Sequence, residues 1–118
     1  MATYTREQLV KSVLGELCQV DPNEDVEAAD YQTVNDRCQA VLEGLYDDGM
    51  IPFDVDTDAI PARYFLPLTW KVARTLVNTY SAQDRESALA ANDVEADRML
   101  NRLIQRGYIP TPTQADYF

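Results

Sequence analysis

The sequence predicts an all-α fold: a small bundle of about four helices, an acidic connecting loop and an extended C-terminal arm. Apolar residues recur at helical spacing through most of the chain, and Pro or Gly residues stand between the periodic stretches. The length of 118 residues allows one domain with a single hydrophobic core. We therefore expect a helical bundle domain over residues 1–106 and a docking arm over 107–118.

The first helix is expected at residues 5–19. Thr5-Arg6-Glu7-Gln8 has the spacing of a capping box, in which the first and fourth residues satisfy each other's backbone amides. The helix should end before Asp21-Pro22-Asn23. Its apolar residues, which recur on one face, are Leu9, Val10, Val13, Leu14 and Leu17.

The second helix is expected at residues 24–47, with Gly49 as its C-terminal stop. Asp47 and Asp48 then lie at the negative end of the helix dipole, where cations are normally favoured. Such a conflict can mark a functional surface, or a nearby arginine can compensate it. The apolar face of this helix consists of Val34, Cys38, Val41, Leu42 and Leu45.

An acidic connection over residues 50–61 follows. Its prolines disfavour a central strand, although a short extended piece is compatible with them. Asp54, Asp56 and Asp58 imitate the first ligands of an EF-hand calcium loop, but the glycine and the final glutamate that such a loop requires are missing. We therefore expect a solvated acidic loop and no metal site.

The third helix is expected at residues 61–81, with Pro61 in its first turn. Pro67 falls inside it and predicts a kink or a 3₁₀-like first turn. Two apolar stripes run along this helix, which indicates that it is central in the bundle or shared with another chain. The inner stripe consists of Phe65, Leu68, Val72, Leu76 and Tyr80, and the outer one of Leu66, Trp70, Ala73 and Val77.

The fourth helix is expected at residues 84–106, with Gly107 as its C-terminal stop. Arg98, Arg102 and Arg106 recur every four residues and should form one exposed stripe. The inner face of this helix consists of Leu89, Ala96, Met99, Leu100, Leu103 and Ile104.

The last twelve residues carry two prolines, Pro110 and Pro112, which forbid a helix and favour an extended arm. Extended segments with large apolar side chains dock into grooves or onto sheet edges of partner proteins. A frayed chain end is the alternative. The four large side chains favour docking, and they are Tyr108, Ile109, Tyr117 and Phe118.

Charge is divided unevenly along the chain. Twenty Asp and Glu face ten Lys and Arg, there is no His, and the net charge is −10. Residues 1–60 hold fourteen carboxylates and three cations, a net charge of −11. Residues 61–118 hold six carboxylates and seven cations, a net charge of +1. This predicts one acidic face and one arginine-bearing face, or simply a solvated acidic surface. The balance argues against a protein that wraps or reads nucleic acid.

No combination of residues points to an enzyme. Without His the usual Ser and Cys nucleophile arrangements are missing, and neither a Walker A nor a dinucleotide-binding glycine motif occurs. Cys18 and Cys38 lie at apolar helical positions and are expected to be reduced core thiols. The N-terminus lacks the plan of a signal peptide, and no apolar run is long enough to span a membrane. We expect a non-enzyme without cofactor, made in a cytoplasm.

Taken together, the order of features resembles the head–tail adaptor (connector, or head-completion) proteins of tailed bacteriophages. The resemblance rests on an acidic helix pair ending in Leu45-Tyr46-Asp47-Asp48-Gly49 and a short Asp-rich connection. Next comes Ile60-Pro61-Ala62-Arg63-Tyr64-Phe65-Leu66-Pro67-Leu68, which enters a long helix, and then another helix and a tail. The resemblance covers residues 5–106 in general plan.

The resemblance implies a structural protein of the virion neck, made in the host cytoplasm, which forms a ring, expected to be a dodecamer, beneath the portal protein. The ring would extend the DNA channel, carry DNA only as non-sticking cargo and meet a neck or tail protein on its distal side. The portal-binding arm would use Tyr108, Ile109, Pro110, Tyr117 and Phe118. The interface between subunits would use Leu66, Trp70, Val77, Arg98, Arg102 and Arg106. The lumen of the channel would be lined by Asp47, Asp48, Asp54, Asp56 and Asp58.

A second function remains open from the sequence. The same negative surface suits an acidic inhibitor that mimics DNA and occupies a nucleic-acid-binding enzyme. Such a mimic needs neither a docking arm nor an apolar interface stripe, so these two features distinguish the two hypotheses.

Overall fold

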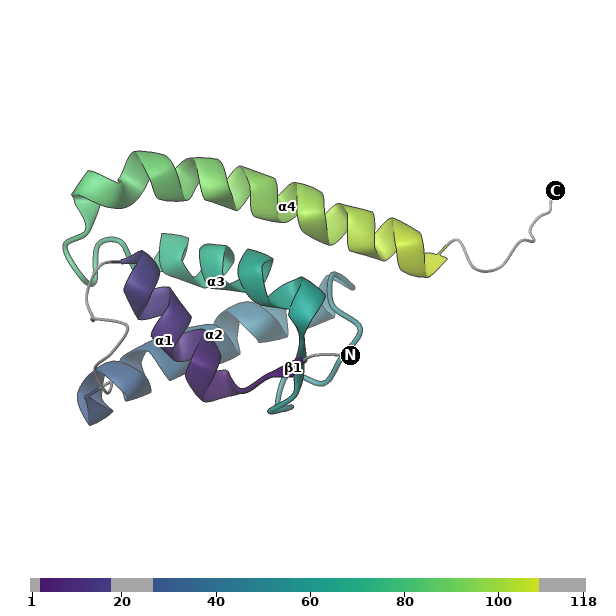
Figure 1. Cartoon of the computed structure of the whole chain (residues 1–118), viewed down its shortest axis with the longest axis horizontal. Coiled ribbons are helices and arrows are strands. Elements are labelled where there is room, and N and C mark those ends of the chain that lie inside the picture. The colour runs from purple at the N-terminus through teal and green to yellow at the C-terminus, as the bar shows by residue number, and fades with distance from the viewer. Residues whose placement is uncertain (1–2, 18–26, 109–118) are drawn as a thin grey trace, which may run out of the picture.

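Four α-helices make up most of the chain in the computed structural model, which describes residues 3–17 and 27–108. The helix α3 lies in the middle, with α1 and α2 on one side of it and α4 on the other (Figure 1). The predicted all-α bundle is confirmed. The helices are α1 (Arg6–Glu16), α2 (Ala28–Asp47), α3 (Ala62–Thr75) and α4 (Glu86–Tyr108), and a 3₁₀ turn, η1 (Gln83–Arg85), leads into α4.

One hydrophobic core joins the four helices. Its centre is α3, whose Leu68 and Val72 are fully buried. Because α3 is covered on both sides, apolar side chains are needed on more than one of its faces, which explains the buried members of the outer stripe, Ala73 and Val77. The fully buried large side chains that other elements contribute are Leu9, Leu14, Leu17, Leu42, Ile60, Leu76, Leu89 and Leu100.

The start of α1 is the predicted capping box. The Gln8 amide donates to Thr5 Oγ1 at 3.1 Å, and the Thr5 amide donates to Gln8 Oε1 at 2.8 Å. The helix ends at Glu16, earlier than expected, and the amide of its C-cap, Leu17, donates to the Val13 carbonyl at 3.1 Å. Position 19, the expected end, lies outside the described residues.

Gly49 is the C-terminal stop of α2, as predicted, and the hydrogen bonds around it form a Schellman motif. Gly49 has φ +75°, its amide donates to the Tyr46 carbonyl at 3.0 Å, and the Met50 amide donates to the Leu45 carbonyl at 2.8 Å. Met50 and Leu45 are each packed against the core. The helix begins at Ala28, and positions 24–26 of the expected start lie outside the described residues.

Two glycines of α2 and its cap should respond in opposite ways to alanine. Gly44 lies inside α2, is exposed, and has open space where a Cβ would stand, so Gly44→Ala should raise the free energy of unfolding by about 0.5–1 kcal/mol. Gly49→Ala should lower it, since the left-handed backbone at φ +75° disfavours a Cβ. Urea unfolding of the two variants measures both changes in unfolding free energy. If both variants were stabilised, or both destabilised, this interpretation would be contradicted.

A two-residue ladder ties the N-terminus to the start of α3. The strand β1 (Thr3–Tyr4) pairs antiparallel with β2 (Ile60–Pro61), with Thr3 opposite Pro61 and Tyr4 opposite Ile60. The Tyr4 ring stacks on the ring of Phe65, with centroids 4.1 Å apart. The connection over residues 50–61 therefore does contain a short extended piece, and it is the strand β2 directly before α3.

The prediction that the third helix runs to residue 81 was wrong. The α-helix ends at Thr75, and turns follow up to Ser81, which has a positive φ of 52°. Arg37 of α2 stabilises this early end, because its Nη1 donates to the Thr75 carbonyl at 3.0 Å. Pro61 is the N-cap, and Pro67 lies within an uninterrupted α-helix, so the first turn is not 3₁₀.

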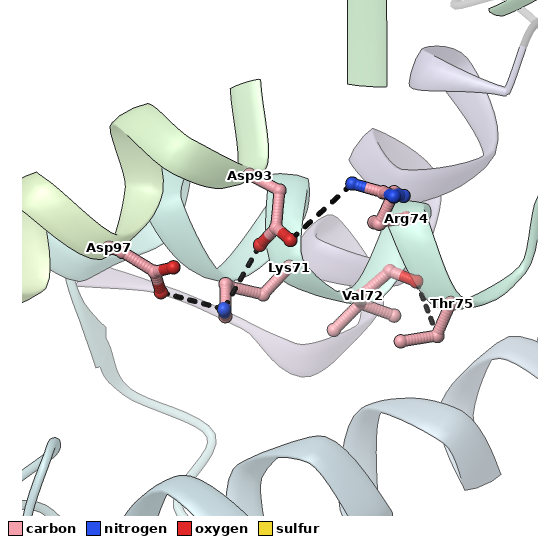
Figure 2. A network of polar contacts seen from close by, with 6 residues as sticks. All are labelled: Lys71, Val72, Arg74, Thr75, Asp93 and Asp97. Carbon is pink, nitrogen blue, oxygen red and sulfur yellow. Dashed lines mark hydrogen bonds and ion pairs between the residues drawn. The ribbon is translucent and has the colours of Figure 1, made fainter. Parts of the chain in front are cut away.

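Ion pairs hold α4 against α3 (Figure 2). Lys71 Nζ of α3 lies 2.7 Å from Asp97 Oδ1 and 3.0 Å from Asp93 Oδ1, both on α4. Arg74 Nη1 lies 3.6 Å from the other oxygen of Asp93. Burial lowers the pKa of Lys71, but the hydrogen bonds and charges of the two aspartates outweigh it and leave the pKa raised. Lys71 is therefore a cation of the α3–α4 contact.

The end of α4 also differs from the prediction. The helix continues through Gly107 to Tyr108, so Gly107 is not its C-terminal stop. Tyr108 therefore belongs to the helix and not to an extended arm. Residues 109–118, the remainder of the expected arm, lie outside the described residues.

Candidate functional site

The five aspartates predicted for a channel lumen are all exposed. Asp47 and Asp48 lie at the end of α2, the second of them as its C-cap, and the last turn of this helix holds no basic residue. Asp54, Asp56 and Asp58 lie on the connection between α2 and β2. The carboxylates therefore form an exposed acidic surface, as the sequence predicts.

The three aspartates of the connection also shape it. Asp58 Oδ1 accepts the Arg6 amide at 2.7 Å and so satisfies the first amide of α1, where the helix dipole favours a carboxylate. Asp56 Oδ1 accepts from Gln39 Nε2 at 3.2 Å, and Asp54 Oδ1 accepts the Asp56 amide at 3.0 Å. Of the three, Asp58 has the clearest structural role.

Arg6 is a residue whose importance the sequence analysis missed. Its guanidinium donates to Asn35 Oδ1 at 3.1 Å and Gln39 Oε1 at 3.2 Å, and also to the Val55 carbonyl. One side chain thus joins α1 to α2 and to the acidic connection. A possible signal was its place in the first turn of a helix, where a cation is unfavourable unless something else holds it.

The arginine stripe of α4 is exposed where the structure describes it. The side chains of Arg98 and Arg102 are 71 % and 69 % exposed, and each lies 3.4–3.5 Å from Glu95 of the same helix. Such exposed pairs contribute little to stability, so both guanidinium groups can engage another molecule. The side chain of Arg106 lies outside the described residues.

Of the three apolar residues expected at a subunit interface, two are at least partly exposed. Leu66 is 43 % exposed and Trp70 is partly exposed. Val77 is not part of that surface: it is 4 % exposed, because α3 ends before it and the following turn directs it into the core. Two large exposed side chains were missed, Tyr46 on α2 and Val94 on α4. Neither residue belongs to the periodic pattern of apolar residues on its helix, so the sequence pattern did not indicate it.

Of the five residues expected to bind a portal, Tyr108 belongs to α4. The other four, Ile109, Pro110, Tyr117 and Phe118, lie outside the described residues. Within residues 3–17 and 27–108, no group of three His, Cys, Asp or Glu side chains is arranged to hold a metal ion. No described helix is both long and apolar enough to cross a membrane.

Cys38 is a buried thiol of α2, and its burial raises its pKa to about 12, while the charge of Arg6 lowers it by less. In a Cys18→Ser variant, whose remaining thiol is Cys38, a disulfide reagent such as DTNB should react only as fast as the protein unfolds. Ellman kinetics in buffer and in denaturant measure this. Fast reaction of the folded variant would contradict it.

The same pKa predicts an alkaline effect with a definite sign. As pH rises from the ordinary thiol value of about 8.5, the unfolded thiol loses its proton first. The folded thiol follows near pH 12, so stability falls across that interval and is unaffected by this group below it. Replacing Cys38 by Ala in the Cys18→Ser variant should remove this part of the loss of unfolding free energy at alkaline pH, as urea unfolding at several pH values would measure.

The arrangement of these surfaces can therefore support contacts with other macromolecules: an acidic surface on α2 and its connection, exposed arginines on α4 and an apolar patch at Leu66 and Trp70. Comparison with family models, with curated proteins and with solved structures finds no match to this chain.

Proposed function

We propose that this chain is a structural head–tail adaptor of a tailed phage, which assembles as a ring beneath the portal and extends the DNA channel. The observation that carries the proposal is the uneven distribution of exposed charge between the two sides of α3. Exposed aspartates cluster on α2 and its connection, whereas α4, on the opposite side (Figure 1), carries the exposed Arg98 and Arg102 together with exposed carboxylates such as Asp97. A subunit whose two sides differ in this way can join head to tail around a ring, with the arginines of one copy facing the aspartates of the next.

The acidic surface gives such a ring its mechanism. If the aspartates of every copy face the lumen, the repeated negative charge repels the DNA backbone and lets it slide without adhering. Leu66 and Trp70 supply apolar area that a neighbouring subunit can cover. The residues beyond α4 would bind the portal, and a neck or tail protein would occupy the distal side.

Mixing the chain with the portal protein from the same genome tests the proposal. Electron microscopy should show rings on the portal, and the complex should be lost when a Gly/Ser linker of equal length replaces residues 109–118. Attachment that survives this replacement would remove the arm from the proposal. Absence of any ring or portal complex would overturn the adaptor function, and salt-sensitive binding to a restriction enzyme or polymerase would support the DNA mimic instead.

The non-stick channel makes a separate prediction. Phage particles that carry Asp54→Lys and Asp56→Lys should eject DNA more slowly, because cations in the lumen attract phosphates. The Asn variants at the same two positions control for the loss of hydrogen-bonding geometry, and Asp58 stays intact because it caps α1. Ejection rates equal to those of the unchanged particle would count against a lumen lined by this connection.

A further inference from the structure

The C-terminal part of α4 extends past the start of α3 (Figure 1). A hollow lies between side chains of this part of α4 and of the first turn of α3. Its volume is about 280 Å³, and it is lined by Arg63, Met99, Arg102 and Leu103. Small-molecule sites occupy about 300–1,000 Å³, so this hollow lies at the lower end of that range and has room for a single large side chain. We call it the α3–α4 pocket.

The lining of the α3–α4 pocket selects a particular chemistry. Met99 and Leu103 are partly buried and provide an apolar wall, while Arg63 and Arg102 place two guanidinium groups beside it. The Arg63 guanidinium lies over the ring of Tyr64, 5.8 Å from its centroid. The described partner of Arg102 is Glu95, at 3.5 Å, which is a long contact on an exposed surface. A fitting occupant therefore combines an aromatic or aliphatic side chain with adjacent carboxylates.

The end of α2 carries that combination. Tyr46 is 51 % exposed and is followed by the exposed carboxylates of Asp47 and Asp48. Both carboxylates lie at the negative end of the helix, and among the described residues no ion pair reaches either of them. Cations from outside the chain would therefore relieve an unfavourable local arrangement.

We propose that Tyr46 of one copy inserts into the α3–α4 pocket of a second copy, with Asp47 and Asp48 facing Arg63 and Arg102. The Schellman motif fixes the backbone at Tyr46 before binding, which lowers the cost of ordering this end of α2. Since α2 and α4 lie on opposite sides of α3, the contact joins two different surfaces, as a head-to-tail ring requires. This inference rests on the proposed function, because the contact would be one of those between neighbouring subunits of the ring.

Two complementary variants test the contact. The first removes the pocket charges (Arg63→Gln, Arg102→Gln), and the second removes the inserting end (Tyr46→Ser, Asp47→Asn, Asp48→Asn). Sedimentation at low salt should show that the unchanged chain self-associates and that each variant alone does so at least about tenfold more weakly. Mixed together, the two variants keep one intact contact between them and should form a 1:1 complex that higher salt weakens.

Arg98→Gln is the matched control, because Arg98 is as exposed as Arg102 and also pairs with Glu95 but does not line the pocket. It should leave self-association unchanged. A monomer at every concentration, equal weakening by Arg98→Gln, or no complex from the mixed variants would each overturn the inference. If the pocket variants still form rings on the portal, the contact is wrong but the adaptor function is supported. If the mixed variants form the 1:1 complex but the chain does not bind the portal, the contact is supported and the adaptor function is wrong.

Discussion

Leu68→Ala should lower the free energy of unfolding by about 2–5 kcal/mol, the range expected when a fully buried leucine is truncated. Leu68 is 0 % exposed and lies in α3, which is packed by α1 and α2 on one side and by α4 on the other. The cavity therefore opens at the centre of the core, where surrounding helices cannot collapse into it without shifting. A domain of this size has a stability of about 5–15 kcal/mol, so the variant loses a large share of it.

Leu66→Ala is the control for this prediction. It removes the same atoms two residues earlier in the same helix, but Leu66 is 43 % exposed, so the change in unfolding free energy should stay within about 0.5 kcal/mol. Urea unfolding of both variants gives the comparison. Equal losses would mean that the helix α3 is not covered as described. If the proposed ring forms, Leu66→Ala should instead weaken its assembly while the fold remains intact.

The ends of the helices show what local sequence determines. The start of α1 at Thr5 and the end of α2 at Gly49 were predicted correctly, because a capping box and a left-handed glycine each depend only on neighbouring residues. The end of α3 was predicted wrongly, because its apolar period continues past Thr75 into Leu76 and Val77. Both remain buried in the turn, so periodicity alone cannot distinguish a continuing helix from a turn packed on the core.

The surface features also divide into those that follow from local sequence and those that depend on distant residues. Exposure of Arg98 and Arg102 follows from their spacing on an amphipathic helix, and it was predicted. The role of Arg6 depends on acceptors 29 to 52 residues away, which no local pattern reveals. The α3–α4 pocket likewise depends on how far α4 extends past α3, a property of the packed helices.

Arg6→Met should cost about 2 kcal/mol or more of unfolding free energy. The substitution keeps the apolar stem but leaves acceptors on Asn35, Gln39 and Val55 without their charged donor, and hydrogen bonds to charged groups are worth about 1.5–3 kcal/mol. The effect should be greatest at the acidic connection. Hydrogen exchange by NMR should show lost protection at the amides of Asp56 and Thr57, which are bonded within that segment.

Arg6→Lys distinguishes the geometry of the guanidinium from its charge. Lysine keeps the positive charge beside α2 but cannot reach several acceptors with a planar fork, so it should recover only part of the lost stability. Arg98→Met controls for loss of a surface arginine and should change little, since its pair with Glu95 is exposed. Full recovery by lysine would mean that charge alone holds the acidic connection against α1 and α2. Partial recovery together with lost amide protection would establish that the fork of Arg6 positions the aspartates of this surface.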